Sequence, residues 1–123
     1  MPVKSSFRLL CVDDDRDAAE MVRLLLKSHG IEVSCAQSAA EAWSKIRAKR
    51  FDLLMLDVWL PRLGGFEFCR QLRDSGCTTP ILFYSGAAGA SDRQKAFAAG
   101  ANAYVTKPDI YGLIEAVLDL MKT

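Results

Sequence analysis

Short apolar runs alternate with longer amphipathic stretches along the whole chain. The runs have the length and composition of β-strands, and they are Phe7–Val12, Ile31–Cys35, Leu53–Leu56, Ile81–Tyr84 and Ala103–Thr106. The stretches that follow them carry apolar residues at helical spacing. In the last stretch, six apolar residues fall on one face of the expected helix: Ile110, Leu113, Ile114, Val117, Leu118 and Met121. The first does the same with Ala18, Val22, Leu25 and Leu26. The pattern predicts five successive βα units.

Local signals mark where the helices begin and end. Ser38 with Glu41, and Ser91 with Gln94, have the spacing of capping boxes, which predicts the starts of the second and fourth helices. Three glycines stand where the first, third and fourth helices should end: Gly30, Gly76 and Gly100.

Successive βα units favour a parallel sheet with helices on both faces. Leu53–Leu56 and Ile81–Tyr84 are continuously apolar, as central strands buried on both faces should be. Ile31–Cys35 alternates, which suits an edge strand. With right-handed crossovers, the sequence predicts a doubly wound α/β fold whose strand order is 2-1-3-4-5.

Composition excludes several classes of function. The net charge of +1, with no Lys/Arg-rich patch, gives no reason to expect nucleic-acid binding by this chain. No apolar run approaches the roughly 18 residues of a membrane span, so we expect no membrane partner and a cytoplasmic location. One histidine and no CxxC pair cannot make a zinc site. We therefore expect buried, reduced thiols at four positions: Cys11, Cys35, Cys69 and Cys77.

Polar residues that carry chemistry follow four of the predicted strands directly. They are Asp13, Asp14 and Asp15 after the first strand, Asp57 after the third, Ser85 after the fourth and Lys107 after the fifth. Sites in such sheets form at the carboxyl ends of the strands. Neighbouring strands lie about 4.8 Å apart, so these groups can converge on one small volume.

Clustered acids repel one another unless a cation lies between them. An all-oxygen cluster selects a hard ion such as Mg²⁺, and a carboxylate left reachable can attack phosphorus. Lys107 and the Ser85 hydroxyl would then help to neutralise the transferring phosphoryl group. Taken singly, each residue has a plainer interpretation: Asp13 or Asp14 as a helix cap, Asp57 as a loop acid, Ser85 as a turn residue, Lys107 as a solvated charge. Their joint placement favours a site.

Four segments resemble the receiver domain of bacterial two-component response regulators: LLCVDDD, FDLLMLDVWLPRLGGFEFCRQLR, ILFYSGA and AYVTKP. The shared motifs are an acid pair, an Asp followed by Pro four residues on and Gly eight residues on, a Ser/Thr, and a Lys-Pro. The resemblance covers residues 1–123 as a single receiver domain and implies a flavodoxin-like (βα)₅ fold.

The resemblance implies a phosphoacceptor and a metal site. Asp57 would be the phosphoacceptor and also a Mg²⁺ ligand. Asp14 would bind the ion directly and Asp13 through water, while the backbone carbonyl of Trp59 would be the third protein ligand.

The resemblance also implies a switch. Ser85 stands at the position of the family's switch hydroxyl and Tyr104 at that of its aromatic switch residue. Lys107 would pair with the phosphoryl group, and the Lys107–Pro108 bond is expected to be cis, which only proline readily permits.

The implied activity is a phosphorylation-dependent switch rather than an enzyme that turns over a substrate. A sensor histidine kinase or phosphotransfer domain would supply the phosphoryl group. The surface of the fourth helix, fifth strand and fifth helix would then act on an output partner or form a homodimer. Two alternatives use the same architecture. An aspartyl-phosphate phosphatase often has a second Asp where this chain has Trp59, and a flavin module would be repelled by Asp13–Asp15.

Three features depart from the family pattern, one of them being Asp109, which stands where an apolar residue is common after Lys-Pro. Trp59 is bulky for its position, and its indole should either pack against Pro61 or a neighbouring loop, or partly cover the acyl phosphate. The segment GAAGAS before the fourth helix offers little side-chain packing, so that helix should be among the least rigid parts of the fold.

Overall fold

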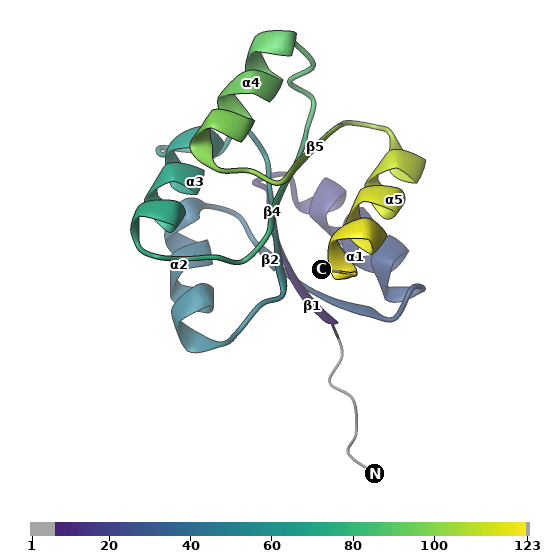
Figure 1. Cartoon of the computed structure of the whole chain (residues 1–123). Coiled ribbons are helices and arrows are strands. Elements are labelled where there is room, and N and C mark those ends of the chain that lie inside the picture. Colours follow the sequence, from purple (N-terminus) through teal and green to yellow (C-terminus); the bar gives the residue numbers. More distant parts are fainter. Residues whose placement is uncertain (1–6, 123) are drawn as a thin grey trace.

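The computed structural model describes residues 7–122. Five parallel strands form one sheet in the order β2-β1-β3-β4-β5, which confirms the predicted doubly wound topology (Figure 1). The strands are β1 (Phe7–Val12), β2 (Ile31–Ala36), β3 (Leu53–Leu56), β4 (Ile81–Ser85) and β5 (Ala103–Thr106). Each lies within one residue of the range expected from the sequence.

One helix follows each strand. The helices are α1 (Arg16–Lys27), α2 (Ala39–Ala48), α3 (Gly65–Asp74), α4 (Ala90–Ala99) and α5 (Ile110–Met121). In Figure 1, α1 and α5 lie on one side of the sheet, and α2, α3 and α4 lie on the other. The sheet is therefore the middle of three layers, as apolar runs without alternation require.

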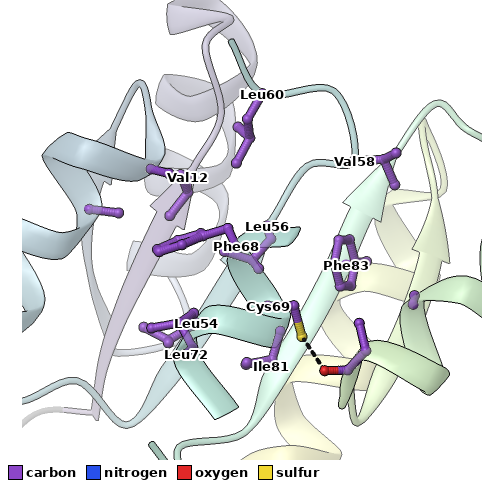
Figure 2. Close-up of a cluster of buried hydrophobic side chains, with 14 of the residues drawn as sticks. Val12, Leu54, Leu56, Val58, Leu60, Phe68, Cys69, Leu72, Ile81 and Phe83 are labelled. Carbon is purple, nitrogen blue, oxygen red and sulfur yellow. Dashed lines mark hydrogen bonds between the residues drawn. The ribbon is translucent and has the colours of Figure 1, made fainter. Parts of the chain in front are cut away.

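Each side of the sheet has its own hydrophobic core. The side covered by α2, α3 and α4 is filled by large residues of α3 and by side chains of β1, β3 and β4, many of which Figure 2 labels. There Cys69 also donates a hydrogen bond from its Sγ to the carbonyl of Ala99, at 3.4 Å. The side covered by α1 and α5 is filled by residues such as Leu26, Leu113 and Val117.

Helix starts follow the sequence signals only in part. Ser38 caps α2 by accepting the Glu41 backbone N–H at 3.2 Å, as predicted, but the Glu41 carboxylate accepts the N–H of Gln37, at 2.7 Å, instead of that of Ser38. The prediction that Ser91 starts the fourth helix is wrong. The helix begins at Ala90, after Gly89, and the carboxylate of Asp92 accepts the Gly89 N–H at 3.2 Å. An acid in the first turn can take this role because free N–H groups gather there.

The predicted helix ends are confirmed. Gly30, Gly76 and Gly100 have φ angles of 77°, 91° and 111°, a left-handed conformation that glycine adopts without a steric cost. At Gly100 space is also limited, because a Cβ would lie 2.6 Å from Cγ of Arg73.

Some predicted core positions are displaced. In α1 the residue that faces the core is Ala19 rather than Ala18, and in α5 Leu118 is 37% exposed rather than buried. All four cysteines are free thiols, but Cys35 and Cys77 are only half-buried. None of the helices in the described part of the chain is long and apolar enough to cross a membrane.

Candidate functional site

The residues singled out at the strand ends converge at the carboxyl edge of the sheet. Their backbones extend the strand ladders by one residue. The N–H of Asp13 donates to Ala36, that of Asp57 to Val12, and that of Lys107 to Ser85, at 2.9, 3.1 and 2.9 Å. The sheet itself therefore fixes where these side chains start.

Asp57 is buried and hydrogen-bonded on both carboxylate oxygens. Its Oδ1 accepts from the Ser85 hydroxyl at 2.6 Å and from the Trp59 backbone N–H at 3.2 Å. Its Oδ2 accepts from the ammonium of Lys107 at 3.1 Å. The side chain is 8% exposed, so donors and one cation replace the water that a carboxylate needs.

Lys107 links two acids. Its Nζ lies 2.7 Å from Asp13 Oδ2 and 3.1 Å from Asp57 Oδ2. Burial pulls the pKa of Lys107 down, but the hydrogen bonds to Asp13 and Asp57 outweigh burial and leave that pKa raised. The ammonium is therefore charged at neutral pH. The Lys107–Pro108 peptide bond is cis, as expected.

The acid pair divides into a buried and an exposed member. Burial raises the pKa of Asp13, against the opposing hydrogen bonds from Lys107 and the Asp15 N–H. Asp14 is exposed and borders a cavity of about 580 Å³ that Trp43 and Pro61 also line. The two neighbouring acids thus face different surroundings.

The helix-capping role belongs to Asp15, which the sequence interpretation passed over. Its carboxylate accepts the N–H groups of Asp17 and Ala18, at 3.0 and 3.2 Å. Neither Asp13 nor Asp14 is the N-cap of α1. The first two acids of the run are therefore available for other chemistry. The signal in the sequence was the position of Asp15 directly before the amphipathic stretch.

The donor set fits a hard cation. Within residues 7–122, no three His, Cys, Asp or Glu side chains are gathered in a metal-binding arrangement, and Lys107 bridges the two buried acids. Counted formally, the three carboxylates of Asp13, Asp14 and Asp57 exceed the one ammonium of Lys107 by two negative charges. Oxygen donors with excess negative charge suit Mg²⁺ better than a soft metal.

The loop after β3 is held close to α3. The N–H of Gly65 donates to the carbonyl of Val58 at 2.9 Å, and a Cβ at Gly65 would lie 2.1 Å from the carbonyl oxygen of Asp57. Only glycine permits this approach. The Gly eight residues after Asp57 thus brings the start of α3 against the backbone of the candidate acceptor.

Trp59 stands on the loop after β3, and its indole is largely exposed. Its side chain is 63% exposed, and a Cβ at Gly86 would lie 3.3 Å from its Cζ3. The indole therefore rests on the loop after β4, which was one of the outcomes expected from the sequence. It spans from the loop of Asp57 to the loop that follows Ser85.

Ser85 and Tyr104 connect the site to the loop before α4. The Ser85 Oγ also lies 3.3 Å from the Ala87 N–H, while the Tyr104 hydroxyl donates to the Ala87 carbonyl. Tyr104 is buried and stacks on Phe83 with ring centroids 6.0 Å apart. The guanidinium carbon of Arg93 lies 5.4 Å from the ring centroid of Tyr104. Ser85 and Tyr104 thus contact one short segment beside Asp57.

Comparison with known proteins agrees with this arrangement. Residues 9–118 match the family model described as the response regulator receiver domain. The response regulator MprA of Mycobacterium bovis (strain BCG / Pasteur 1173P2) is 44% identical over 103 residues, which are 84% of this chain and 45% of that relative. The chain thus spans less than half the length of the curated relatives it matches.

Solved structures give the same result. A putative response regulator from Chloroflexus aurantiacus J-10-fl superposes with a TM-score of 0.90 at 35% identity, over 97% of this chain and 100% of the other. The chemotaxis protein CheY4 of Vibrio cholerae superposes with a TM-score of 0.87 at 30% identity, over 94% of this chain and 99% of the other. With this fold and this family match, the chain belongs to the receiver-domain family of two-component response regulators.

Proposed function

We propose that Asp57 accepts a phosphoryl group from a phosphohistidine and that the modified chain acts as a signalling switch. The observation that carries this proposal is the placement of the Asp57 carboxylate between the Ser85 hydroxyl and the Lys107 ammonium. A carboxylate oxygen at a strand end, with a cation and a hydroxyl beside it, is equipped to attack phosphorus and to stabilise the charge on its oxygens.

The transfer conserves atoms and charge. An Asp57 oxygen forms the new O–P bond while the P–N bond to the partner's imidazole breaks, and the released nitrogen takes up a proton. Lys107 then pairs with the phosphoryl oxygens. The donor would be a sensor histidine kinase or a phosphotransfer domain.

The Mg²⁺ that we propose for the site would be held by Asp13, Asp14, Asp57 and the backbone carbonyl of Trp59. When bound, it would neutralise negative charge on the phosphoryl oxygens. Asp14 supports this assignment because it is exposed and not engaged as the cap of α1.

Phosphorylation would act on α4 through Ser85 and Tyr104. A phosphoryl group on Asp57 offers new acceptor oxygens to the Ser85 hydroxyl, and both side chains contact Ala87 in the loop before α4. Movement of that loop would alter the surface formed by α4, β5 and α5, where an output partner or a second copy of the chain would bind.

The experiment that tests this function uses a small phosphodonor. Wild-type protein with Mg²⁺ and acetyl phosphate should gain the mass of one phosphate, as an acid-stable and base-labile adduct. Asp57→Asn should gain none while keeping its fold by circular dichroism, because the swap removes the nucleophile but little volume. A phosphate adduct on the Asn variant would show that Asp57 is not the acceptor.

The same experiment separates the alternatives. A phosphatase with an aspartyl intermediate would release inorganic phosphate over many turnovers without accumulating the phosphorylated chain, whereas the proposed switch should accumulate the adduct. A flavin-binding module would purify with a yellow cofactor. We expect neither, because Trp59 stands where such a phosphatase carries a second acid and Asp13–Asp15 would repel a phosphate-bearing cofactor.

A further inference from the structure

Tyr84 occupies a position beside the site that its sequence context does not reveal. It lies in an apolar run and is 3% exposed, within the core formed with α1 and α5. Successive residues of a strand face opposite sides of the sheet. Ser85 turns its hydroxyl to Asp57 on one side, and Tyr84 places its ring on the other.

Lys107 lies close to this ring. Its Nζ is 5.7 Å from the ring centroid of Tyr84, and its backbone N–H is bound to the Ser85 carbonyl at 2.9 Å. An ammonium at this distance is attracted by the negative face of an aromatic ring. The ammonium is thus contacted by the two carboxylates of Asp13 and Asp57 and by one aromatic ring.

The hydroxyl of Tyr84 does not explain why a tyrosine is present. Within residues 7–122 it is the buried side-chain polar atom without a hydrogen-bond partner. A buried, unpaired hydroxyl lowers stability. Burial also raises the pKa of Tyr84, so the phenol stays protonated. What the residue contributes to the site is therefore its ring.

We propose that Tyr84 is a positioning residue that holds the Lys107 ammonium beside Asp57 for phosphoryl transfer. The proposal rests on the function proposed above. Its physical basis is that the carboxylates of Asp13 and Asp57 are also candidate ligands of a divalent cation, whereas the ring is neutral and binds no such ion. If these carboxylates bind a metal, their oxygens are less free to hold Lys107. The contact between Lys107 and the Tyr84 ring does not depend on those oxygens and would persist.

The test compares Tyr84→Phe, which keeps the ring, with Tyr84→Leu, which keeps apolar bulk without it. The first readout needs neither metal nor phosphodonor: NMR of the Lys107 ε-methylene group, assigned with Lys107→Arg. Wild type and Tyr84→Phe should show the upfield shift that a neighbouring ring induces, and Tyr84→Leu should lose it.

The second readout is the initial rate of phosphorylation by acetyl phosphate with Mg²⁺. Tyr84→Phe should react like wild type, and Tyr84→Leu should react roughly 3- to 30-fold more slowly, as expected from the loss of a cation–π contact. Urea unfolding checks the folds, and Tyr84→Phe should unfold at a higher urea concentration than wild type because it lacks the unpaired hydroxyl. Should Tyr84→Leu fail to fold, Tyr84→Met gives the same comparison.

The outcomes distinguish this inference from the proposed function. If wild type gains no phosphate, the proposed function fails, and the NMR comparison still decides whether the ring holds Lys107. If wild type is phosphorylated and Tyr84→Leu matches it in rate or in the Lys107 shift, the positioning role is wrong. A loss of rate in Tyr84→Phe equal to that in Tyr84→Leu would also overturn it, since the hydroxyl would then be the active part.

Discussion

Two helices of equal length, α3 and α4, cover the same side of the sheet but are anchored differently. Helix α3 buries the large side chains of Phe68 and Leu72 together with Cys69, whereas the buried residues among the ten of α4 are Ala96 and Ala99. A fully buried Leu or Phe contributes about 1.5–3 kcal/mol, and an alanine methyl far less. The loop before α3 is therefore held beside a firmly packed helix, whereas fewer apolar contacts hold α4.

The anchoring of α4 is also uneven along its length. At its C-terminal end, Cys69 donates to the Ala99 carbonyl and Arg73 to the Gly100 carbonyl. Near its N-terminal end, Ala87 is buried in the core, the Tyr104 hydroxyl donates to the Ala87 carbonyl, and the Tyr104 carbonyl accepts from Arg93 at 3.3 Å. This end lies beside the site, so a change at Asp57 would reach the least firmly held part of the helix.

The largest effect is expected from a pair of substitutions that tests whether α3 is anchored more firmly than α4. Phe68→Ala should lower the free energy of unfolding by about 3–5 kcal/mol, because it leaves a cavity in the core under α3. Phe97→Ala, on α4 and 45% exposed in the wild type, should lower it by only about 1 kcal/mol, because nearly half of this residue already faces water. Urea denaturation of both variants measures the difference, and equal losses would remove the distinction between the two helices.

A second pair tests whether Asp14 is a metal ligand while its neighbour Asp15 acts only as a helix cap. Asp14→Ala should weaken Mg²⁺ binding at least tenfold and raise stability slightly, because one of several like charges is removed. Asp15→Ala should keep the affinity for Mg²⁺ but lower stability by about 1 kcal/mol, because α1 loses its cap. Metal titration followed by tryptophan fluorescence measures the affinity. An unchanged affinity in Asp14→Ala would exclude that residue as a ligand.

Hydrogen exchange measures the mobility of α4 directly. In the unmodified protein, amides of residues 86–97 should exchange faster than those of residues 65–74 in α3, since fewer apolar contacts hold them. Treatment with beryllofluoride, a mimic of the phosphoryl group, should slow exchange in residues 86–97. Equal protection of this segment in both forms would count against a switch that works by ordering α4.

The smallest expected effect concerns Trp59, whose indole reaches from the loop after β3 to Gly86 in the loop before α4. If the ring hinders attack by water on phospho-Asp57, Trp59→Asn should lose its phosphate several-fold faster than wild type. Trp59→Phe keeps an aromatic ring and should hydrolyse at close to the wild-type rate. A rate in Trp59→Asn no faster than wild type would leave the indole as a packing residue only.

The arrangement of the sheet follows from the sequence because burial dictates it. Leu53–Leu56 is buried throughout as the middle strand, and β2, whose sequence alternates, lies at the edge. The convergence of Asp13, Asp57, Ser85 and Lys107 also follows, since parallel strands deliver their ends to one edge. These predictions needed only periodicity and topology.

Other details depend on tertiary contacts that periodicity does not encode. The start of α4 shifts because Asp92 satisfies the Gly89 N–H, an option as plausible locally as a cap at Ser91. The orientation of the Trp59 indole depends on space above Gly86 in a different loop. Likewise, the ring of Tyr84 meets Lys107 only because β4 and β5 pair in one register.

Peptide mapping by mass spectrometry can establish directly whether Asp57 carries the phosphoryl group. Wild-type protein is treated with Mg²⁺ and acetyl phosphate, reduced with borohydride to convert the acyl phosphate into a stable alcohol, and digested. We predict that the modification lies on Asp57 alone and is absent when Mg²⁺ is chelated. A modification on Asp13 or Asp14 instead, or none at all, would contradict the account.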